Sequence, residues 1–564
     1  MSPICGILSR SGEDVSARMT SMLHTFDSEG AADAWLVSNT TSKTPFGYDE
    51  QMRQISPTKQ AVAQVSFVTR EQPVEQPSSD PSGKLAIFYE GNLYNIKELR
   101  ANRASDHKVT NGSAAETVAH LLEKTYQGDL GMALKQVSPI LDGAYCLAAS
   151  DGEHIMLMTD PVGLRPAFYA EDGDLIAFAS NKKALWQIGL RNVKSLRAGM
   201  AASFSKKGVS LSEVHPLSRW GIRVTIDDPA TAIDRYCLFL KEAVDKRMKN
   251  LKRVGVLVSG GVDSCLIAML ASDIAARQNI EVTAYTAGVS GAADIEYAER
   301  FAQESGLSHR VRRLSHDEIE AYIPKVVTAV EERDLVQIEA GIGIYAAVEM
   351  ASEDGIRVIF SGQGPDELWG GYSWYPQVIA QEGYEGLQQR MWGDLTRADI
   401  ETLNRENRIA LAHRVEEVFP YVDTEVIKLA MSVSPQLKIT SAEDKIGKRP
   451  HREAAKRLGL AAQYADRSKD AAQHGTGIHD VLDVIAINNG FTPELVKGVG
   501  YNSEEISEEK LASSTRYGYL YAEKELWQTP EHVQFFLDWV ACENDLLNES
   551  EKSRIEGFLE KARR

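Results

Sequence analysis

The sequence lacks three features that are typical of particular classes of protein: a long apolar run, paired cysteines and an excess of positive charge. A membrane-spanning helix needs ~20 apolar residues, and the N-terminus MSPICGILSR lacks the apolar stretch of a signal peptide. The five cysteines are scattered without a CxxC pair, which excludes a disulfide framework and a cysteine zinc site. A net charge of −18 repels nucleic-acid backbones. We expect a cytoplasmic, soluble protein that binds neither nucleic acid nor membrane.

The composition is that of an ordinary globular protein, and 564 residues suffice for about three domains or two large ones. Residues 1–205 contain short apolar runs separated by Gly and Asp turns, which predicts a sandwich of antiparallel sheets. Residues 206–230 have the character of a connection. In residues 231–564 strand and helix patterns alternate, which predicts a doubly wound parallel sheet followed by a helical C-terminal region. The expected fold is therefore a two-domain α/β architecture.

The sharpest local signal is SGGVDS at 259–264, directly after the apolar run VGVLVS and before a helical pattern. Its glycines allow backbone N–H groups to approach a phosphate, and the helix N-terminus adds its positive end. Asp263 can hold a divalent cation. The segment predicts a cradle for nucleotide phosphates, and it is not a Walker loop because the GxxxxGK[ST] spacing is absent.

A second motif, SGQGPDELWGGY at 361–372, follows another predicted strand. Together the two motifs resemble those of the asparagine synthetase and β-lactam synthetase family, whose ATP pyrophosphatase domain splits ATP into AMP and pyrophosphate. The stretch RSKDAAQ at 467–473 is similar to the one that carries a catalytic lysine in that family, here Lys469. The resemblance implies a carbon–nitrogen ligase that adenylates a carboxylate and transfers ammonia or an amine to it.

The resemblance also assigns the site, with ATP and Mg²⁺ as cofactors. It gives Mg²⁺ to Asp263 and Asp294, the α phosphate to Lys469, and the acceptor to Asp366 and Glu367. The residues that it assigns to the nucleotide are Leu257, Ser259, Gly260, Gly261, Val262, Asp263, Ser264, Ala287, Ser361 and Gly362. A plainer interpretation treats Asp366 and Glu367 as acids of a helix N-terminus and Lys469 as a solvated charge.

One position departs from the family pattern. Gln363 replaces the usual glutamate of SGEG, and an amide cannot accept a proton as a base does. Either another acid such as Glu339 or Glu332 deprotonates the attacking amine, or Gln363 only orients it.

The first domain resembles the class II glutamine amidotransferase domain, an N-terminal-nucleophile fold with an αββα sandwich. The matching segments are Cys5-Gly6-Ile7, GNLYN at 91–95, DPVGLRP at 160–166 and FASNKKAL at 178–185. As a fold match this pattern covers the whole domain.

The working parts of a glutaminase are missing from this domain. In that chemistry the nucleophile is the first residue, because its own α-amine is the base, yet four residues precede Cys5. Cys5 is catalytic only if a propeptide is removed. Glu90 stands where the family has its oxyanion-hole asparagine, and Ala114 stands where an aspartate holds the glutamine amine. The arginine of the family's RGPD motif is also absent from 28–33. We expect a degenerate domain that does not hydrolyse glutamine.

The leading hypothesis is an ATP-dependent, AMP-forming amide ligase that takes ammonia or an amine as donor and aspartate or another acid as acceptor. The resemblance also allows a homodimer. Three alternatives stay open: an amide synthetase of the β-lactam synthetase type that closes a ring or accepts an amine, a glutamine-dependent asparagine synthetase after propeptide removal, and a non-catalytic ATP-binding regulator.

Overall fold

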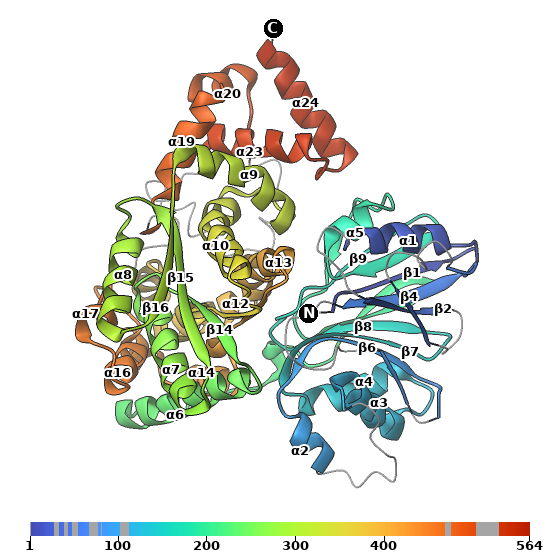
Figure 1. Ribbon diagram of the computed structural model, residues 1–564, viewed down its shortest axis with the longest axis horizontal. Coiled ribbons are helices and arrows are strands. Elements are labelled where there is room, and N and C mark those ends of the chain that lie inside the picture. Colours follow the sequence, from blue (N-terminus) through green and yellow to red (C-terminus); the bar gives the residue numbers. More distant parts are fainter. Residues whose placement is uncertain are drawn as a thin grey trace. The chain divides into compact units, whose positions relative to one another are not determined.

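The computed structural model describes residues 2–26, 33–38, 43–47, 55–66, 77–80, 82–101, 112–468, 475–503 and 530–563. They fall into two compact units (Figure 1). The first unit is Met1–Gly221 with Ala398–Glu416, and the second is Ile222–Arg397 with Glu417–Arg564. In this described part of the chain, no helix is long and apolar enough to cross a membrane.

Two antiparallel sheets form the centre of the first unit. The seven-stranded sheet has the order β11-β9-β10-β1-β4-β2-β3, and the six-stranded sheet has the order β13-β12-β8-β7-β6-β5. The strands of the first sheet are β1 (Ile4–Ser9), β2 (Asp33–Ser38), β3 (Lys43–Gly47), β4 (Gln60–Ser66), β9 (Phe168–Asp172), β10 (Leu175–Ala179) and β11 (Lys194–Ser195). Those of the second are β5 (Ser78–Ser79), β6 (Ala86–Leu93), β7 (Gly143–Ser150), β8 (Ile155–Thr159), β12 (Met200–Ser205) and β13 (Gly208–Glu213).

Helices cover the outer face of each sheet. On the first sheet lie α1 (Ser16–His24) and α5 (Lys182–Trp186), and on the second lie α3 (Ala114–Thr125) and α4 (Leu130–Val137), with α2 (Ile96–Ala101) beside α3. Because side chains alternate along a strand, each sheet contributes to two cores. Ile4 and Leu8 of β1 join the core between the sheets, whereas Cys5 and Ile7 join the core under α1.

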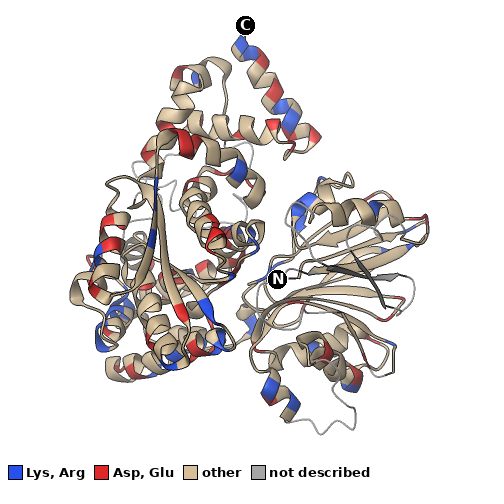
Figure 2. Cartoon of the chain, in the orientation of Figure 1, with Lys and Arg blue, Asp and Glu red and all other residues tan. Residues whose placement is uncertain are grey.

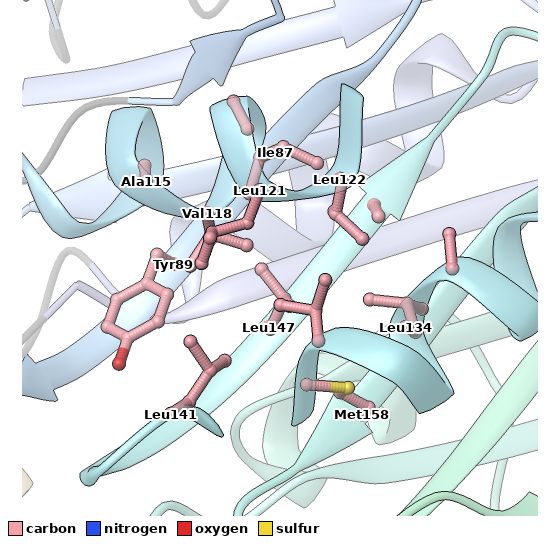
Figure 3. Close-up of a cluster of buried hydrophobic side chains, with 14 of the residues drawn as sticks. Ile87, Tyr89, Ala115, Val118, Leu121, Leu122, Leu134, Leu141, Leu147 and Met158 are labelled. Atoms are coloured by element: carbon pink, nitrogen blue, oxygen red, sulfur yellow. The ribbon is translucent and has the colours of Figure 1, made fainter. Parts of the chain in front are cut away.

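The third core lies between the second sheet and its helices. Leu147 and Met158 from the strands meet Val118, Leu121 and Leu134 from α3 and α4 (Figure 3). Two sheets between two helical layers, with a core at each of the three junctions, confirm the αββα sandwich.

A late segment of the chain belongs to the first unit. Residues 398–416, with α13 (Asn404–Ala412), bind the loops that follow β8 and β11. Arg165 donates to Asn407 Oδ1 at 2.8 Å and to Glu416 Oε1 at 3.0 Å, and Arg197 donates to Asp399 at 3.0 Å. This return lies inside the range 231–564 that the sequence assigns to the second domain, and β13 lies inside the predicted connection 206–230.

The second unit contains a five-stranded sheet with the order β16-β15-β14-β17-β18. Its strands are β14 (Arg253–Leu257), β15 (Glu281–Val289), β16 (Ser308–Leu314), β17 (Val358–Phe360) and β18 (Glu416–Val418). β14 pairs in parallel with β15 and β17, and β15 pairs in parallel with β16. The predicted doubly wound sheet is thereby confirmed. Its strand order reverses between β14 and β17, and in such sheets ligands bind at the carboxyl ends of the strands beside the reversal.

Right-handed crossovers place α7 (Val262–Gln278) and α8 (Ala293–Ser305) on one face of this sheet and α10 (Leu335–Glu353) on the other. α6 (Pro229–Met248) packs on α7, and α9 (His316–Val330) packs on α10. The remaining helices are α11 (Pro365–Trp369), α12 (Tyr375–Leu395), α14 (Thr424–Ser432), α15 (Pro435–Lys438), α16 (Arg449–Arg457), α17 (Ala462–Ala465), α19 (Ile478–Asn488), α20 (Pro493–Val499), α23 (Glu531–Glu543) and α24 (Glu549–Arg563). Acidic and basic residues alternate along α24 (Figure 2). The predicted helical C-terminal region is confirmed.

Candidate active site

The predicted phosphate cradle connects β14 to α7, as its strand and helix patterns indicate. Gly260 has φ +74°, and a Cβ there would lie 2.4 Å from the Cβ of Tyr297, so only glycine fits. A Cβ on Gly261 would meet only Ser259 Oγ, at 3.6 Å. Ser259 N donates to Ser264 Oγ at 3.1 Å and closes the turn. An open backbone ahead of the first turn of α7 offers N–H donors to an anion, so the residues present fit a phosphate group.

The second motif packs directly on this cradle. A Cβ on Gly362 would lie 3.1 Å from Ser264 N, and Ser361 N donates to Val418 O at 3.0 Å. Leu257 ends β14, and Ala287 lies in the last part of β15. All the residues that the sequence assigns to the nucleotide therefore lie at or beside the carboxyl ends of β14, β15 and β17.

Two of the predicted site acids share one buried ammonium. Lys448 Nζ lies 2.6 Å from Asp263 Oδ2 and 2.8 Å from Asp366 Oδ1, and the lysine side chain is 1% exposed. Burial alone would lower the pKa of Lys448, but the two carboxylates raise it above its ordinary value, so the amine stays charged. Lys448 thus ties the start of α7 to α11.

An imidazole and two phenols complete this cluster. His451 Nε2 lies 2.9 Å from Asp263 Oδ1, and His451 Nδ1 lies 2.8 Å from Tyr236 OH. Tyr421 OH donates to the Asp263 carbonyl at 2.7 Å. Burial lowers the pKa of His451 despite the neighbouring Asp263 carboxylate, so the ring is neutral at pH 7. Asp263 is therefore held through both its side chain and its backbone.

Gly371 of the second motif makes room for this cluster. A Cβ on Gly371 would lie 1.9 Å from Asp366 Oδ1 and 2.1 Å from Lys448 Cε. Glu367, which is 4% exposed, accepts a hydrogen bond from Tyr372 OH. Gln363 is partly exposed in the loop between β17 and α11. Asp366 and Glu367 both lie in the first turn of α11, whose N-cap is Gly364 without a side-chain cap, and Asp366 also pairs with Lys448.

Asp294 reaches the cradle through an arginine. It lies in the first turn of α8 and forms an ion pair with Arg467 Nη2 at 2.9 Å. Arg467 also donates to Ser259 O at 2.9 Å, and its guanidinium lies 4.0 Å from the centre of the Tyr297 ring. Lys469 lies outside the described residues.

The donor set fits a Mg²⁺ ion that arrives with a nucleotide. Within the described ranges, no three His, Cys, Asp or Glu side chains converge as a self-sufficient metal site. Mg²⁺ typically takes one or two carboxylates together with phosphate oxygens, and Asp263, 20% exposed at the mouth of the cradle, can supply one.

The sequence did not identify Lys448, His451 or Arg467 as site residues. Lys448 is the N-cap residue of α16 and His451 lies in its first turn, so the two are neighbours in the sequence, and this closeness is the signal that could have suggested a joint role. Lys448 also has φ +53°, a conformation that non-glycine residues adopt mainly at constrained sites.

In the first unit, Cys5 does not lie at the start of a strand. It is the second residue of β1, it is fully buried, and its Sγ lies 3.8 Å from Met19 Sδ. Burial raises the pKa of the Cys5 thiol to about 12. The two residues before Cys5 are held by hydrogen bonds from neighbouring segments of the chain. Val65 N donates to Pro3 O, and Ser180 N donates to Ile4 O, both at 2.9 Å.

The other two positions that match glutaminase residues have structural roles. Glu90 is 2% exposed and accepts a hydrogen bond from Ser180 Oγ at 2.5 Å. Burial raises the pKa of Glu90, although Ser180 and Arg165 act to lower it. Ala114 is the first residue of α3 and packs in the core under the second sheet. Residues 28–32, where the family arginine would stand, lie outside the described residues.

Comparisons with known proteins agree for both units. A family model described as asparagine synthase matches residues 238–386 and 377–487, and one described as a glutamine amidotransferase domain matches residues 63–187. A putative glutamine-hydrolyzing asparagine synthetase 1 of Methanocaldococcus jannaschii is 30% identical over 468 residues, which cover 75% of this chain and 83% of the relative.

A glutamine-hydrolyzing asparagine synthetase 3 of Arabidopsis thaliana is 27% identical over 380 residues, which cover 65% of this chain and 62% of that relative. The chain thus spans less than two thirds of the plant relative. Among solved structures, the glutamine phosphoribosylpyrophosphate amidotransferase from B. subtilis is 19% identical with a TM-score of 0.33, covering 51% of this chain and 67% of that one. A likeness this weak does not bear on function.

Proposed function

Because this chain belongs to the asparagine synthetase family, we propose that it forms an amide from aspartate and free ammonia or an amine, without hydrolysing glutamine. The chain is an ATP-dependent carbon–nitrogen ligase that produces AMP and pyrophosphate. The observation that carries the proposal is the packing of Gly362 on Ser264, which brings the phosphate cradle and the second motif into one site.

The residues of this site divide the work of adenylation. The N–H groups of the cradle and the start of α7 bind phosphate oxygens. Asp263 would hold Mg²⁺, which supplies positive charge beside the leaving pyrophosphate. Lys448 fixes the carboxylates of Asp263 and Asp366 relative to each other. The resemblance assigns the charge at the α phosphate to Lys469, and Asp366 and Glu367 to the acceptor side.

The loss of glutamine hydrolysis rests on the position of Cys5 inside β1. A nucleophile of this type needs its own free α-amine, and the thiolate is the reactive form. Release of that amine would remove Ile4, which pairs with Gln64 of β4 and whose carbonyl accepts from Ser180 N at 2.9 Å. The thiol also belongs to the apolar core under α1, where burial opposes the thiolate.

The test is incubation with ATP, Mg²⁺ and L-aspartate, with either ammonium chloride or glutamine as nitrogen donor. We expect AMP, pyrophosphate and asparagine with ammonium only, and no glutamate with glutamine. Asp263→Asn abolishes AMP formation, whereas Cys5→Ala leaves ammonium-dependent synthesis unchanged. ADP and phosphate as products would contradict the ligase chemistry, and glutamate formed in step with AMP would contradict the lost glutaminase.

A further inference from the structure

A carboxylate and an imidazole outside the cluster around Asp263 form a close pair. His479 Nδ1 lies 2.7 Å from Glu339 Oε2. The Glu339 side chain is 3% exposed, while that of His479 is 32% exposed, so the acid is internal and the ring reaches the surface of the unit. Since a carboxylate accepts from Nδ1–H, this hydrogen bond selects the tautomer whose Nε2 is basic.

The direction of α10 places this pair at the ligand-binding edge of the sheet. α10 precedes β17 and runs antiparallel to it, so its first turns lie at the carboxyl ends of the strands. The opposite end confirms the direction: Asp354, just after α10, contacts Tyr285 OH at 3.1 Å, and its carbonyl accepts from Arg253, the first residue of β14. Glu339 lies in the second turn of α10, on the side where β14 and β17 carry the two motifs.

A short segment links the pair to the nucleotide site. A Cβ on Gly475 would lie 2.5 Å from the Asp294 carboxylate, and Val289 N donates to Thr476 O at 2.9 Å. A Cβ on Gly343, one turn after Glu339, would meet Thr476 and Ile478 at 3.4 Å and Ala287 O at 3.6 Å. The chain from Gly475 to His479 thus crosses the end of β15, with Asp294 at one end and Glu339 at the other.

We propose that His479, held by Glu339, is the base that takes the proton from the attacking nitrogen, the role that Gln363 cannot fill. This inference rests on the proposed function. The nitrogen forms a bond to the acyl carbon of the adenylated acid as the bond from that carbon to the AMP oxygen breaks. The proton lost from nitrogen passes to His479 Nε2, and the imidazolium is stabilised by the Glu339 carboxylate before the proton leaves to water.

The charges around the ring suit this role. The Glu339 hydrogen bond raises the pKa of His479 above its ordinary value, burial lowers it, and Asp480 and Asp483 on the same helix raise it further. From the packed helices, α9 contributes Glu320, which binds Asn489, and α23 contributes His532, whose Nε2 lies 2.9 Å from Asp483. A base works best when its pKa lies near the operating pH, which this balance favours.

The test separates adenylation from amide formation in the full-length protein. AMP release by the wild type with aspartate is measured first, because failure of the proposed function appears there. For His479→Gln we expect aspartate-dependent exchange of pyrophosphate into ATP to stay within about threefold of wild type, while amide formation from ammonium falls ~100-fold or more. Hydroxylamine restores product formation, because its nitrogen is more acidic than that of ammonia after attack on the acyl carbon and loses its proton to water without the imidazole.

Two further variants keep this test sharp. Glu339→Gln keeps an acceptor for Nδ1–H but loses the charge, so the acid limb of the pH profile for amide formation moves to lower pH. His532→Gln removes the histidine–carboxylate pair between α23 and Asp483 of α19 and leaves both steps unchanged. Equal loss of exchange and amide formation in His479→Gln, no rescue by hydroxylamine, or an unmoved acid limb in Glu339→Gln would overturn the proposal.

Discussion

The motif positions of the two units lie in opposite surroundings, charged in the second unit and apolar in the first. In the second unit the carboxylates of Asp263 and Asp366 share a charged lysine, and Gly371 leaves room for that arrangement. In the first unit Cys5 lies in an apolar core and Ala114 packs under a sheet. The three apolar cores stabilise the sandwich whether or not the domain catalyses a reaction.

The largest effect is expected for Lys448→Met, which leaves the carboxylates of Asp263 and Asp366 next to each other without their buried cation. Removing one partner of a buried ion pair typically costs 3–5 kcal/mol, so we expect about that loss in the free energy of unfolding together with loss of AMP formation. Urea denaturation and an AMP assay measure both effects.

A matched control for this variant is Lys428→Ala, which removes an exposed ion pair with Glu425. Exposed pairs contribute about 0–1 kcal/mol, so stability and activity should change little. Equal effects of the two substitutions would mean that the Lys448 bridge is not the link between the two motifs.

The second prediction concerns Gly371→Ala. Its new Cβ would overlap Asp366 Oδ1, and the cluster must move. We expect AMP formation to fall ~100-fold, since such shifts of reacting groups by about 1 Å cost that much. Gly498→Ala in α20 is the control, because nothing lies within 4 Å of its Cβ and its φ is ordinary. That change should stabilise the fold by about 0.4–1 kcal/mol without affecting turnover.

The parts of the site that sequence can predict are those that are contiguous and lie at a strand end. SGGVDS and SGQGPDELWGGY each follow a strand, so their place at the carboxyl edge follows from the alternation of strands and helices. Lys448 comes 185 positions after Asp263, and nothing in the local pattern connects them. The sequence also gives no sign that residues 398–416 return to the first unit. Asp399 contacts Arg197, and Asn407 contacts Arg165, only in the folded chain.

The place of a motif within its strand is a second feature that the sequence alone does not give. Cys5-Gly6-Ile7 matches the amidotransferase pattern letter by letter, but the match does not reveal how these residues are packed. Ser2 and Pro3 are buried, and Ile4 pairs with Gln64 of β4, so the match begins inside a strand rather than at its start. The prediction of β-structure in this region is confirmed, but the burial of the Cys5 thiol depends on tertiary packing.

The smallest effect is expected at Glu90, and it tests whether the first unit holds this carboxyl in its neutral form. Burial raises the pKa of Glu90, so the folded protein binds a proton more tightly than the unfolded chain does. The stabilisation from Glu90 is therefore fully present below its unfolded pKa of about 4.3 and is lost as pH rises through the folded pKa. Glu90→Gln keeps an acceptor for Ser180 Oγ but cannot ionise, so its Tm relative to wild type should rise as pH increases from 4 to 8. Glu213→Gln, at an exposed ion pair with Arg219, serves as the control whose Tm difference varies little over that range. A Tm difference for Glu90→Gln that stays flat or falls with pH would mean that Glu90 is ionised in the folded protein, and the contrast between the two units would then be one of position rather than of charge.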